Sequence, residues 1–421
     1  MKDYNKYIYM VLAVIALALF SYYEYSLLVD HFDGLRIEES KNSEYYKKNS
    51  EKFNICQKDD VNKADVTFTL NARAALLLDA TNNRVLFEKK GYDQMAMAST
   101  TKIMTCIVAL ENGNLDDVVT FSKKAASMPD VQLNAKTGEQ FYLRDLLYSL
   151  MLESHNDTAV AIAEHIGGSV EGFAELMNEK ARELGCMNTN FVTPNGLDAP
   201  GHYTTAYDLA RIASYAIKNE DFVKITNTPS REFTTIDSKR SFGITNKDRF
   251  LYLMDGAMGV KTGFTNNAGY CFVGALKRDG KIFVSVVLGC GWPPNKSYKW
   301  KDTQNLMQYG IDNYEYQDIT VKEMEFLDIP VPNGKTKVVY VDTTDVDLNV
   351  LVQDDDCVQV EYVIEDRLMA PVYAGDQVGV VNYYINNLLY KEVPVVALNT
   401  VEKIDLRYCF DELLDRFLIG N

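Results

Sequence analysis

Apolar and alternating runs divide the middle of the chain into strands and helices. Residues 72–79 and 84–88 are short apolar runs joined by an Asn-rich turn, which predicts a strand hairpin. The runs 268–278 and 281–288, separated by Asp-Gly, predict a second hairpin. Between the hairpins, residues 99–219 have mainly helical periodicity. Strands, a helical insertion and strands again predict an α/β body, an antiparallel sheet flanked by helices with a helical subdomain.

The pattern changes after this body. Short strand-like runs separated by turn residues fill 318–398 and predict a small all-β domain. The segment 399–421 predicts an amphipathic helix with Leu406 and Phe410 on one face and Asp405 and Glu412 on the other. Because helices that lie on membranes are usually basic, the acidic face favours packing on the protein.

The N-terminal residues 1–23 predict a membrane segment. Residues 7–23 carry no charge, and Lys2 and Lys6 precede them, so the chain is expected to begin in the cytoplasm. At 1.5 Å per residue the run spans about 25 Å, which is workable for a bilayer. A cleaved signal peptide is the alternative. The small-x-small pair at Ala16 and Ala18 lies inside the apolar run, so we favour an uncleaved anchor.

The remaining N-terminal sequence connects this segment to the body. Residues 24–62 are polar and charged, which predicts a spacer between the membrane and a catalytic domain at 63–315. We therefore expect a single-pass protein of the cell membrane with its catalytic domain outside the cytoplasm. If the N-terminal segment is cleaved, the protein is secreted.

Composition narrows the function classes. The net charge of −16 excludes nucleic acid as a partner, since nothing would offset phosphate repulsion. The four histidines have no metal-ligand spacing, and no metal is expected. The seven cysteines are odd in number and never form a Cys-x-x-Cys pair. They indicate neither a disulfide framework nor a zinc site, and most are expected to be small core residues.

The most informative local pattern is Ser99 followed by Lys102. On a helix, two residues three positions apart share a face, so the hydroxyl and the amine can meet. A serine is a weak nucleophile until a neighbouring base takes its proton. A serine that opens a helix is more often only an N-cap, so the pair needs support from other residues.

Two further patterns follow in sequence order. Ser154 and Asn156 lie between apolar helical segments, where a hydroxyl and an amide can both face a cleft. Lys261-Thr262-Gly263 precedes the second hairpin and is expected on a neighbouring strand, where glycine allows a ligand to approach the backbone. A second Lys-Thr-Gly at 136–138 lies in a polar turn and is rejected. A copy of Ser-x-Asn at 40–42 lies in the spacer and shows how common that pattern is.

The order Ser-x-x-Lys, Ser-x-Asn, Lys-Thr-Gly resembles the active-site serine penicillin-recognising enzymes. Within them the chain is similar to the D-alanyl-D-alanine carboxypeptidases, the low-molecular-mass penicillin-binding proteins. The segments 191–198 and 202–210 support the likeness, and residues 370–376 resemble the β-rich C-terminal domain of that family. The resemblance therefore implies a β-lactamase/transpeptidase-like body followed by a β domain. Met97 stands where the family usually has proline, which is expected to loosen the turn into the helix.

The resemblance implies a role for each motif residue. Ser99 would attack the D-Ala-D-Ala peptide bond and form an acyl-enzyme, with no metal or organic cofactor. Lys102 would be the base, which requires that burial and the charge of Lys261 lower its pKa. Ser154 would relay a proton to the leaving D-alanine. The substrate, a peptidoglycan stem peptide, or a β-lactam inhibitor would contact the following side chains and backbone N–H groups: Asn156, Lys261, Thr262, and the amides of Ser99 and Phe264 as oxyanion hole.

Other interpretations stay open. The family tends to hold the substrate carboxylate with a cation after the last sheet strand, and Lys296 is a candidate, although it could equally be an exposed surface lysine. A serine β-lactamase shares all three motifs, but no Glu-x-x-x-Asn lies between Ser154 and Lys261 and it has no use for the β domain. A penicillin sensor or scaffold without turnover is disfavoured because residues 24–62 are too short for a signalling module.

Overall fold

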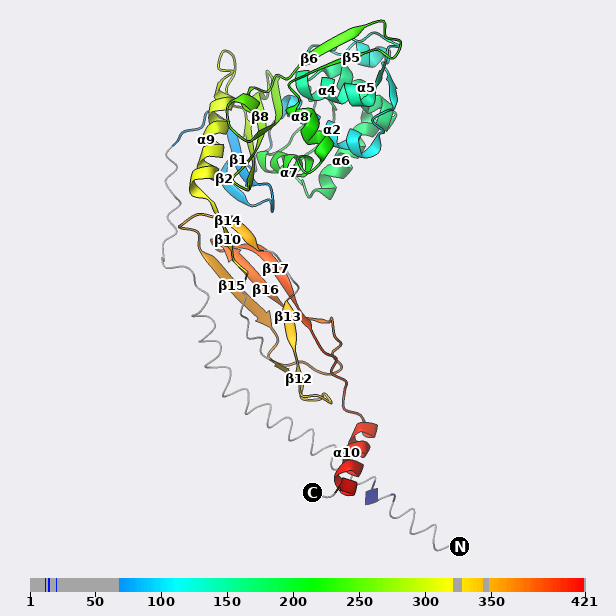
Figure 1. The fold of residues 1–421 in the computed structure, drawn as a ribbon, viewed down its shortest axis with the longest axis vertical. Helices are drawn as coiled ribbons and strands as arrows, with labels where there is room; N and C mark the ends of the chain where they lie inside the picture. The colour runs from blue at the N-terminus through cyan, green and yellow to red at the C-terminus, as the bar shows by residue number, and fades with distance from the viewer. Residues whose placement is uncertain are drawn as a thin grey trace, which may run out of the picture. The chain divides into compact units, whose positions relative to one another are not determined.

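The computed structural model describes residues 68–320, 328–343 and 348–419, together with positions 12, 14, 15 and 20. The predicted membrane segment and spacer otherwise lie outside the described residues. The chain forms two compact units, of which one is Val66–Glu315 and the other contains the described residues from Tyr316 onward (Figure 1). Among the described residues, no helix has the length and apolar character needed to cross a bilayer.

A five-stranded antiparallel sheet forms the centre of the first unit. The two predicted hairpins are confirmed, and they meet because β1 pairs with β9, with Leu76 opposite Val286. β1 is buried along its whole length, since both faces of the sheet are covered. The strand order is β2-β1-β9-β8-β7, with bounds β1 Ala74–Asp79, β2 Val85–Lys89, β7 Ala257–Thr265, β8 Gly269–Arg278 and β9 Lys281–Leu288.

Helices cover both faces of this sheet (Figure 1). On one face α9, Tyr298–Asn313, approaches so closely that a Cβ at Gly310 would lie 2.9 Å from Leu77 and 3.1 Å from Phe283. On the other face Leu76 and Val286 join a large apolar cluster with the remaining helices. These helices are α2 Lys102–Asn112, α3 Lys123–Ala126, α4 Leu143–Tyr148, α5 Asn156–Gly167, α6 Val170–Glu183, α7 Ala206–Ala216 and α8 Glu220–Asn227.

The helical region also contains short elements that the periodicity missed. Two small hairpins, β3–β4 and β5–β6, lie within or beside it, and a π-helical turn at Ser149–Glu153 precedes α5. Three-residue strands such as β3 are too short for an alternating pattern to identify. Their bounds are β3 Val118–Thr120, β4 Gln140–Tyr142, β5 Ser230–Thr234 and β6 Ser241–Thr245.

The second unit is built from β-strands around an apolar core. Its four-stranded antiparallel sheet has the order β13-β17-β16-β15. Val381 and Val395 are completely buried in it. The strands are β10 Glu315–Asp318, β11 Ile329–Pro330, β12 Val338–Val339, β13 Val341–Thr343, β14 Asn349–Val352, β15 Val358–Ile364, β16 Gln377–Ile385 and β17 Leu388–Ala397.

The C-terminal helix α10, Leu406–Ile419, lies inside the predicted segment. Cys409 is buried, whereas Leu406 is 70% exposed. Tyr408 donates to the backbone carbonyl of Lys335 at 3.4 Å, so the first turn contacts the β unit. The apolar face is therefore only partly covered within the described part of the chain.

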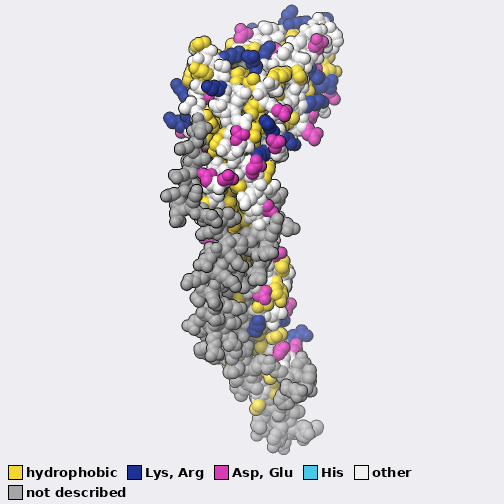
Figure 2. All heavy atoms as spheres, turned by 60° about the vertical axis from the view of Figure 1, so that its left-hand side comes forward, with side chains coloured by type: hydrophobic (Ala, Val, Ile, Leu, Met, Phe, Trp, Pro, Cys, Tyr) yellow, Lys and Arg dark blue, Asp and Glu magenta, His cyan; other side chains and the backbone are white. Residues whose placement is uncertain are grey.

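One expectation from composition is wrong in part, because Cys357 is disulfide-bonded. The other described cysteines are free and buried, as expected for core residues: Cys106, Cys186, Cys271, Cys290 and Cys409. The spacing of the cysteines in the sequence does not show which of them pair. On the face drawn in Figure 2, acidic and basic side chains are interspersed over the sheet-bearing unit.

Candidate active site

Ser99 lies in a tight turn that leads into α2. The turn is a 3₁₀ helix, Ala98–Thr101, and Ala98 has a positive φ of 49°. Thr100 and Thr101 donate from their hydroxyls to the carbonyls of Met97 and Ala98 at 2.6 and 2.8 Å. Met97 is fully buried. The turn is thus held by its own threonines, and Lys102 begins the α-helix immediately after it.

Lys102 contacts Ser99, as the spacing predicts. Its Nζ atom lies 3.0 Å from Ser99 Oγ, 2.9 Å from Asn156 Oδ1 and 2.5 Å from the carbonyl oxygen of Asn195. The side chain is completely buried. These contacts join the first motif, the second motif and a loop 93 residues away in sequence.

The orientation of the Asn156 amide is fixed by its other contacts. Its Nδ2 donates to the carbonyls of Pro129 and Asp130, both at 3.1 Å, so Oδ1 faces Lys102. The Asn156 and Asn195 oxygens can only accept hydrogen bonds. A neutral lysine amine has two N–H groups for them, which leaves its lone pair for the Ser99 hydroxyl. The arrangement can therefore activate Ser99 as a nucleophile.

The electrostatic surroundings favour this neutral form. Burial lowers the pKa of Lys102 well below its ordinary value, and the positive charge of Lys261 lowers it further, while Asp157 opposes the shift. Burial also lowers the pKa of Lys261 to about 7, against the carboxylate of Asp248 and with the help of Lys299. A base at this position needs a lowered pKa, and burial and the charge of Lys261, the two causes expected from the resemblance, both lower it.

Lys261, Thr262 and Gly263 lie on β7, the edge strand next to β8, as predicted. A Cβ at Gly263 would lie 3.1 Å from both the Met97 carbonyl and the Ser99 amide nitrogen, so only glycine lets β7 run this close to the nucleophile. Lys261 shares the same strand face, since side chains alternate. Phe264 follows directly and is 38% exposed.

Ser154 occupies the turn between the π-helical segment and α5. Its backbone is left-handed, with φ 70° and ψ 32°. Its Oγ is buried and has no hydrogen-bond partner. The structure therefore places Ser154 beside Asn156 but does not join its hydroxyl to Lys102 or Lys261.

Residues 191–198 and 202–210, which support the family resemblance in sequence, also contact the nucleophile turn and Lys102. Besides the Asn195 carbonyl, Gly196 approaches the nucleophile turn so closely that a Cβ there would lie 2.1 Å from the Ala98 carbonyl oxygen. His202 Nδ1 accepts from the Val192 amide at 3.0 Å, so its Nε2–H donates to Thr101 Oγ1 at 2.9 Å. Burial lowers the pKa of His202 to about 4, which agrees with a neutral ring. A backbone carbonyl leaves no signature in sequence, so only the fold identifies it.

Two lysines after the last sheet strand differ in burial. Lys296 is exposed, whereas Lys299 is buried at the start of α9. Lys299 Nζ lies 5.4 Å from the ring centroid of Tyr270, and that ring packs 4.7 Å from Phe264. Lys299, and not Lys296, lowers the pKa of Lys261. Lys299 is therefore the cation that shares the electrostatic environment of β7.

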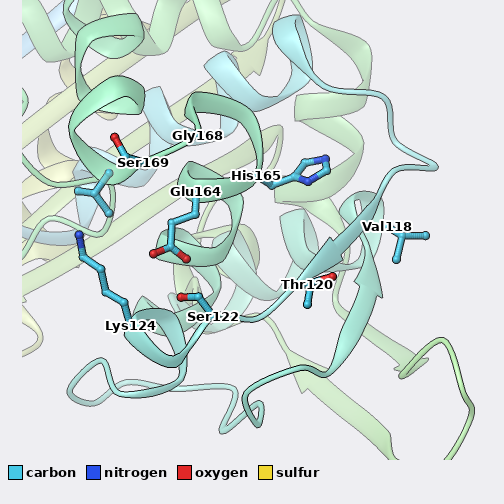
Figure 3. A pocket seen from close by; sticks show the side chains of 9 residues that line it. Val118, Thr120, Ser122, Lys124, Glu164, His165, Gly168 and Ser169 are labelled. Atoms are coloured by element: carbon cyan, nitrogen blue, oxygen red, sulfur yellow. The ribbon is translucent and has the colours of Figure 1, made fainter.

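A hollow of about 400 Å³ in the first unit is lined by other residues (Figure 3). Lys124, Glu164 and Ser122 line it, and no motif residue does. Within the described residues, no cluster of three or more His, Cys, Asp or Glu side chains could hold a metal ion.

The chain matches two known families in sequence. Residues 59–291 match the D-alanyl-D-alanine carboxypeptidase family, and residues 314–403 match the penicillin-binding protein 5 C-terminal domain. The chain is 31% identical over 340 residues to the D-alanyl-D-alanine carboxypeptidase DacF of Bacillus subtilis (strain 168), which covers 79% of this chain and 86% of the relative. The corresponding DacC of Escherichia coli (strain K12) is 28% identical over 349 residues, with 80% and 85% covered.

Solved structures agree with the sequence matches. Penicillin-binding protein 5 from Haemophilus influenzae is similar with a TM-score of 0.67 and 26% identity, covering 81% of this chain and 100% of that chain. The DacD carboxypeptidase from Francisella tularensis gives a TM-score of 0.63 and 27% identity, covering 83% and 98%. The predicted fold class, a transpeptidase-like body followed by a β domain, is confirmed. The chain belongs to the D-alanyl-D-alanine carboxypeptidase family of serine peptidases.

Proposed function

We propose that this protein removes the terminal D-alanine from peptidoglycan stem pentapeptides through an acyl-enzyme on Ser99. The observation that carries the proposal is the Lys102 amine, buried 3.0 Å from Ser99 Oγ between two oxygens that only accept hydrogen bonds. Family membership supports the substrate class. β-Lactams would acylate the same serine as inhibitors.

In the acylation step, Ser99 Oγ forms a bond to the carbonyl carbon of the penultimate D-alanine while its proton passes to Lys102. The backbone N–H groups of Ser99 and Phe264 would stabilise the oxyanion, a contribution of about 3 kcal/mol. The C–N bond then breaks, and the leaving amine takes the proton through Ser154. Asn156 holds Lys102 in place and would contact the substrate peptide.

In the deacylation step, water attacks the ester and Lys102 accepts the water proton, which returns to Ser99 Oγ as the ester bond breaks. The products are the shortened peptide and free enzyme. The terminal carboxylate of the substrate would lie near Lys261, Thr262 and Lys299. We assign Lys299 rather than Lys296 to this carboxylate because its Nζ lies 5.4 Å from the ring of Tyr270, which packs against Phe264 of β7.

The decisive experiment follows free D-alanine released from a synthetic stem pentapeptide. The wild-type protein is expected to release it, and Ser99→Ala is expected to release none while keeping its melting temperature. Labelled penicillin distinguishes the alternatives. A long-lived adduct with D-alanine release supports the carboxypeptidase, rapid penicillin hydrolysis supports a β-lactamase, and an adduct without D-alanine release supports a sensor.

We also propose that residues 1–23 anchor the protein in the cell membrane with the catalytic unit outside the cytoplasm. The uncharged run after Lys2 and Lys6 supports this proposal. Expression of the full chain with and without residues 1–23, followed by membrane fractionation and protease treatment of intact cells, tests it. Recovery of the full-length protein in the soluble fraction would contradict the anchor.

A further inference from the structure

Ser154 is held between two residues that contact each other across it. His155 Nε2 lies 3.3 Å from Glu153 Oε2. Ser154 itself is left-handed, a conformation that non-glycine residues rarely adopt unless the surroundings impose it. Because its hydroxyl has no partner, the Ser154 side chain does not stabilise this conformation. The restraint must come from the neighbours.

The His155 ring is anchored on the helix side. It is buried, and its Nδ1 lies 2.8 Å from Ser149 Oγ, which lies 2.9 Å from Thr158 Oγ1. Thr158 can donate to Ser149, Ser149 to Nδ1, and Nε2–H to Glu153, which satisfies every member of the chain with a neutral ring.

Burial of the ring favours that neutral state. Burial lowers the pKa of His155, against the carboxylates of Asp157 and Glu153 and with the help of Lys102. The imidazole therefore acts as a fixed connector and not as an acid or base.

Glu153 contacts a different part of the chain, the segment at the end of β6 that contains Thr245 and Lys247. Its Oε1 accepts from Lys247 Nζ at 2.9 Å and from the Thr245 amide at 3.0 Å. The Lys247 amide in turn donates to the Leu152 carbonyl at 3.0 Å. Partial burial raises the pKa of Glu153, but the contacts with Lys247 and Thr245 outweigh it, so the pKa is below its ordinary value.

We propose that Glu153 and His155 are positioning residues that together hold the Ser154 backbone in its left-handed conformation, with the hydroxyl directed into the active site. The proposal rests on the role of Ser154 given above. His155, the middle residue of Ser-x-Asn, then positions Ser154 and does not only separate the serine from the asparagine. The proposal also explains why a histidine and a glutamate flank a serine whose own side chain makes no hydrogen bond.

The first test measures D-alanine release by single variants. His155→Ala is expected to lower kcat about tenfold or more with KM changed less than about threefold, since a conformation lost by tenfold in population lowers the rate by the same factor. His155→Gln, which can still donate to Glu153, should recover most of the rate. Asp145→Asn is the matched control, because it breaks the ion pair with Arg231, 2.7 Å long, without touching the Ser154 turn.

The second test separates positioning from general damage. In a Ser154→Ala background, His155→Ala should lower kcat by less than about twofold, because two residues acting through the same group are not additive. Equal losses in both backgrounds, or a wild-type kcat for His155→Ala, would overturn the proposal. Ser99→Ala and Ser154→Ala, measured alone, report separately whether the proposed function and the Ser154 role hold.

Discussion

The two units of the molecule differ in what they bury. In the sheet-bearing unit, charged side chains lie inside the protein, among them Lys102, Lys261, Asp248 and Lys299. In the described part of the β unit, every buried side chain is apolar, tyrosine or cysteine, as at Val381 and Val395. Burying a charge is costly unless it is paired or neutralised. The sheet-bearing unit therefore contains buried charged groups that are costly for stability and available for chemistry. The core of the β unit contributes stability alone.

The largest expected effect comes from removing a buried charge-bearing group. Lys102→Met is expected to lower acylation by labelled penicillin about 1,000-fold, since general base catalysis contributes about 100- to 10,000-fold. It also leaves the Asn156 and Asn195 oxygens without a donor. Stopped-flow acylation measures the loss. An unchanged rate would mean that Lys102 is structural and that another base serves Ser99.

The next effect concerns substrate binding. Lys299→Ala is expected to raise KM for a pentapeptide about 10- to 100-fold, because a hydrogen bond to a charged group contributes about 1.5–3 kcal/mol. Lys296→Ala is the matched control on the same segment and should change KM less than about twofold, because the proposal assigns the carboxylate to Lys299. A substrate with a C-terminal amide should abolish the difference. If Lys296→Ala has the larger effect, the assignment of the carboxylate must be reversed.

A third comparison creates a small cavity in each unit by the same substitution, valine to alanine. Val395→Ala in β17 and Val273→Ala in β8 each remove buried methyl groups and should lower the free energy of unfolding by about 2 kcal/mol. Only Val273 pairs with Lys261 across the sheet. We therefore expect D-alanine release to fall for Val273→Ala and to stay unchanged for Val395→Ala. Denaturant unfolding and the peptide assay measure both, and equal activity losses would remove the distinction between the units.

The last comparison concerns the pH dependence of stability. Lys261 and Lys299 have folded pKa values of about 7 and about 8, below the unfolded value of 10.5. Between these limits the unfolded chain binds more protons than the folded chain, so the free energy of unfolding should rise with pH from 7 to 9. Above pH 9 buried thiols lower the free energy of unfolding as the pH rises, because burial raises the pKa of Cys106 and the folded chain then binds more protons.

The matched variant for this last effect is Lys299→Met, which should flatten the rise. Urea unfolding at pH 7, 8 and 9 measures it. Substitution in the β unit, as in Val395→Ala, should leave the slope unchanged because no buried lysine lies there within the described residues. A wild-type slope in Lys299→Met would show that other groups dominate the linkage.

Most of the fold was predictable because its signals are local. Both hairpins of the central sheet, the helical region between them and the strand position of Lys261 follow from short local patterns. The strand β17 lies inside the predicted all-β domain, although its first half, with Lys391 and Glu392, is not an apolar run. The disulfide of Cys357 could not be predicted, because the spacing of the cysteines does not show which of them pair.

The sequence by itself determined the nucleophile and its base, because three residues of one turn bring Ser99 and Lys102 together without help from elsewhere. Only the tertiary structure decided that the Lys102 amine is neutral and that its lone pair faces the Ser99 hydroxyl. The Asn195 carbonyl, the fixed Asn156 amide and the charge of Lys261 come from distant segments, and complete burial makes each of them strong. Hydrogen-bond and charge effects of this kind depend on which atoms exclude water from a site, and that is a property of the packed fold.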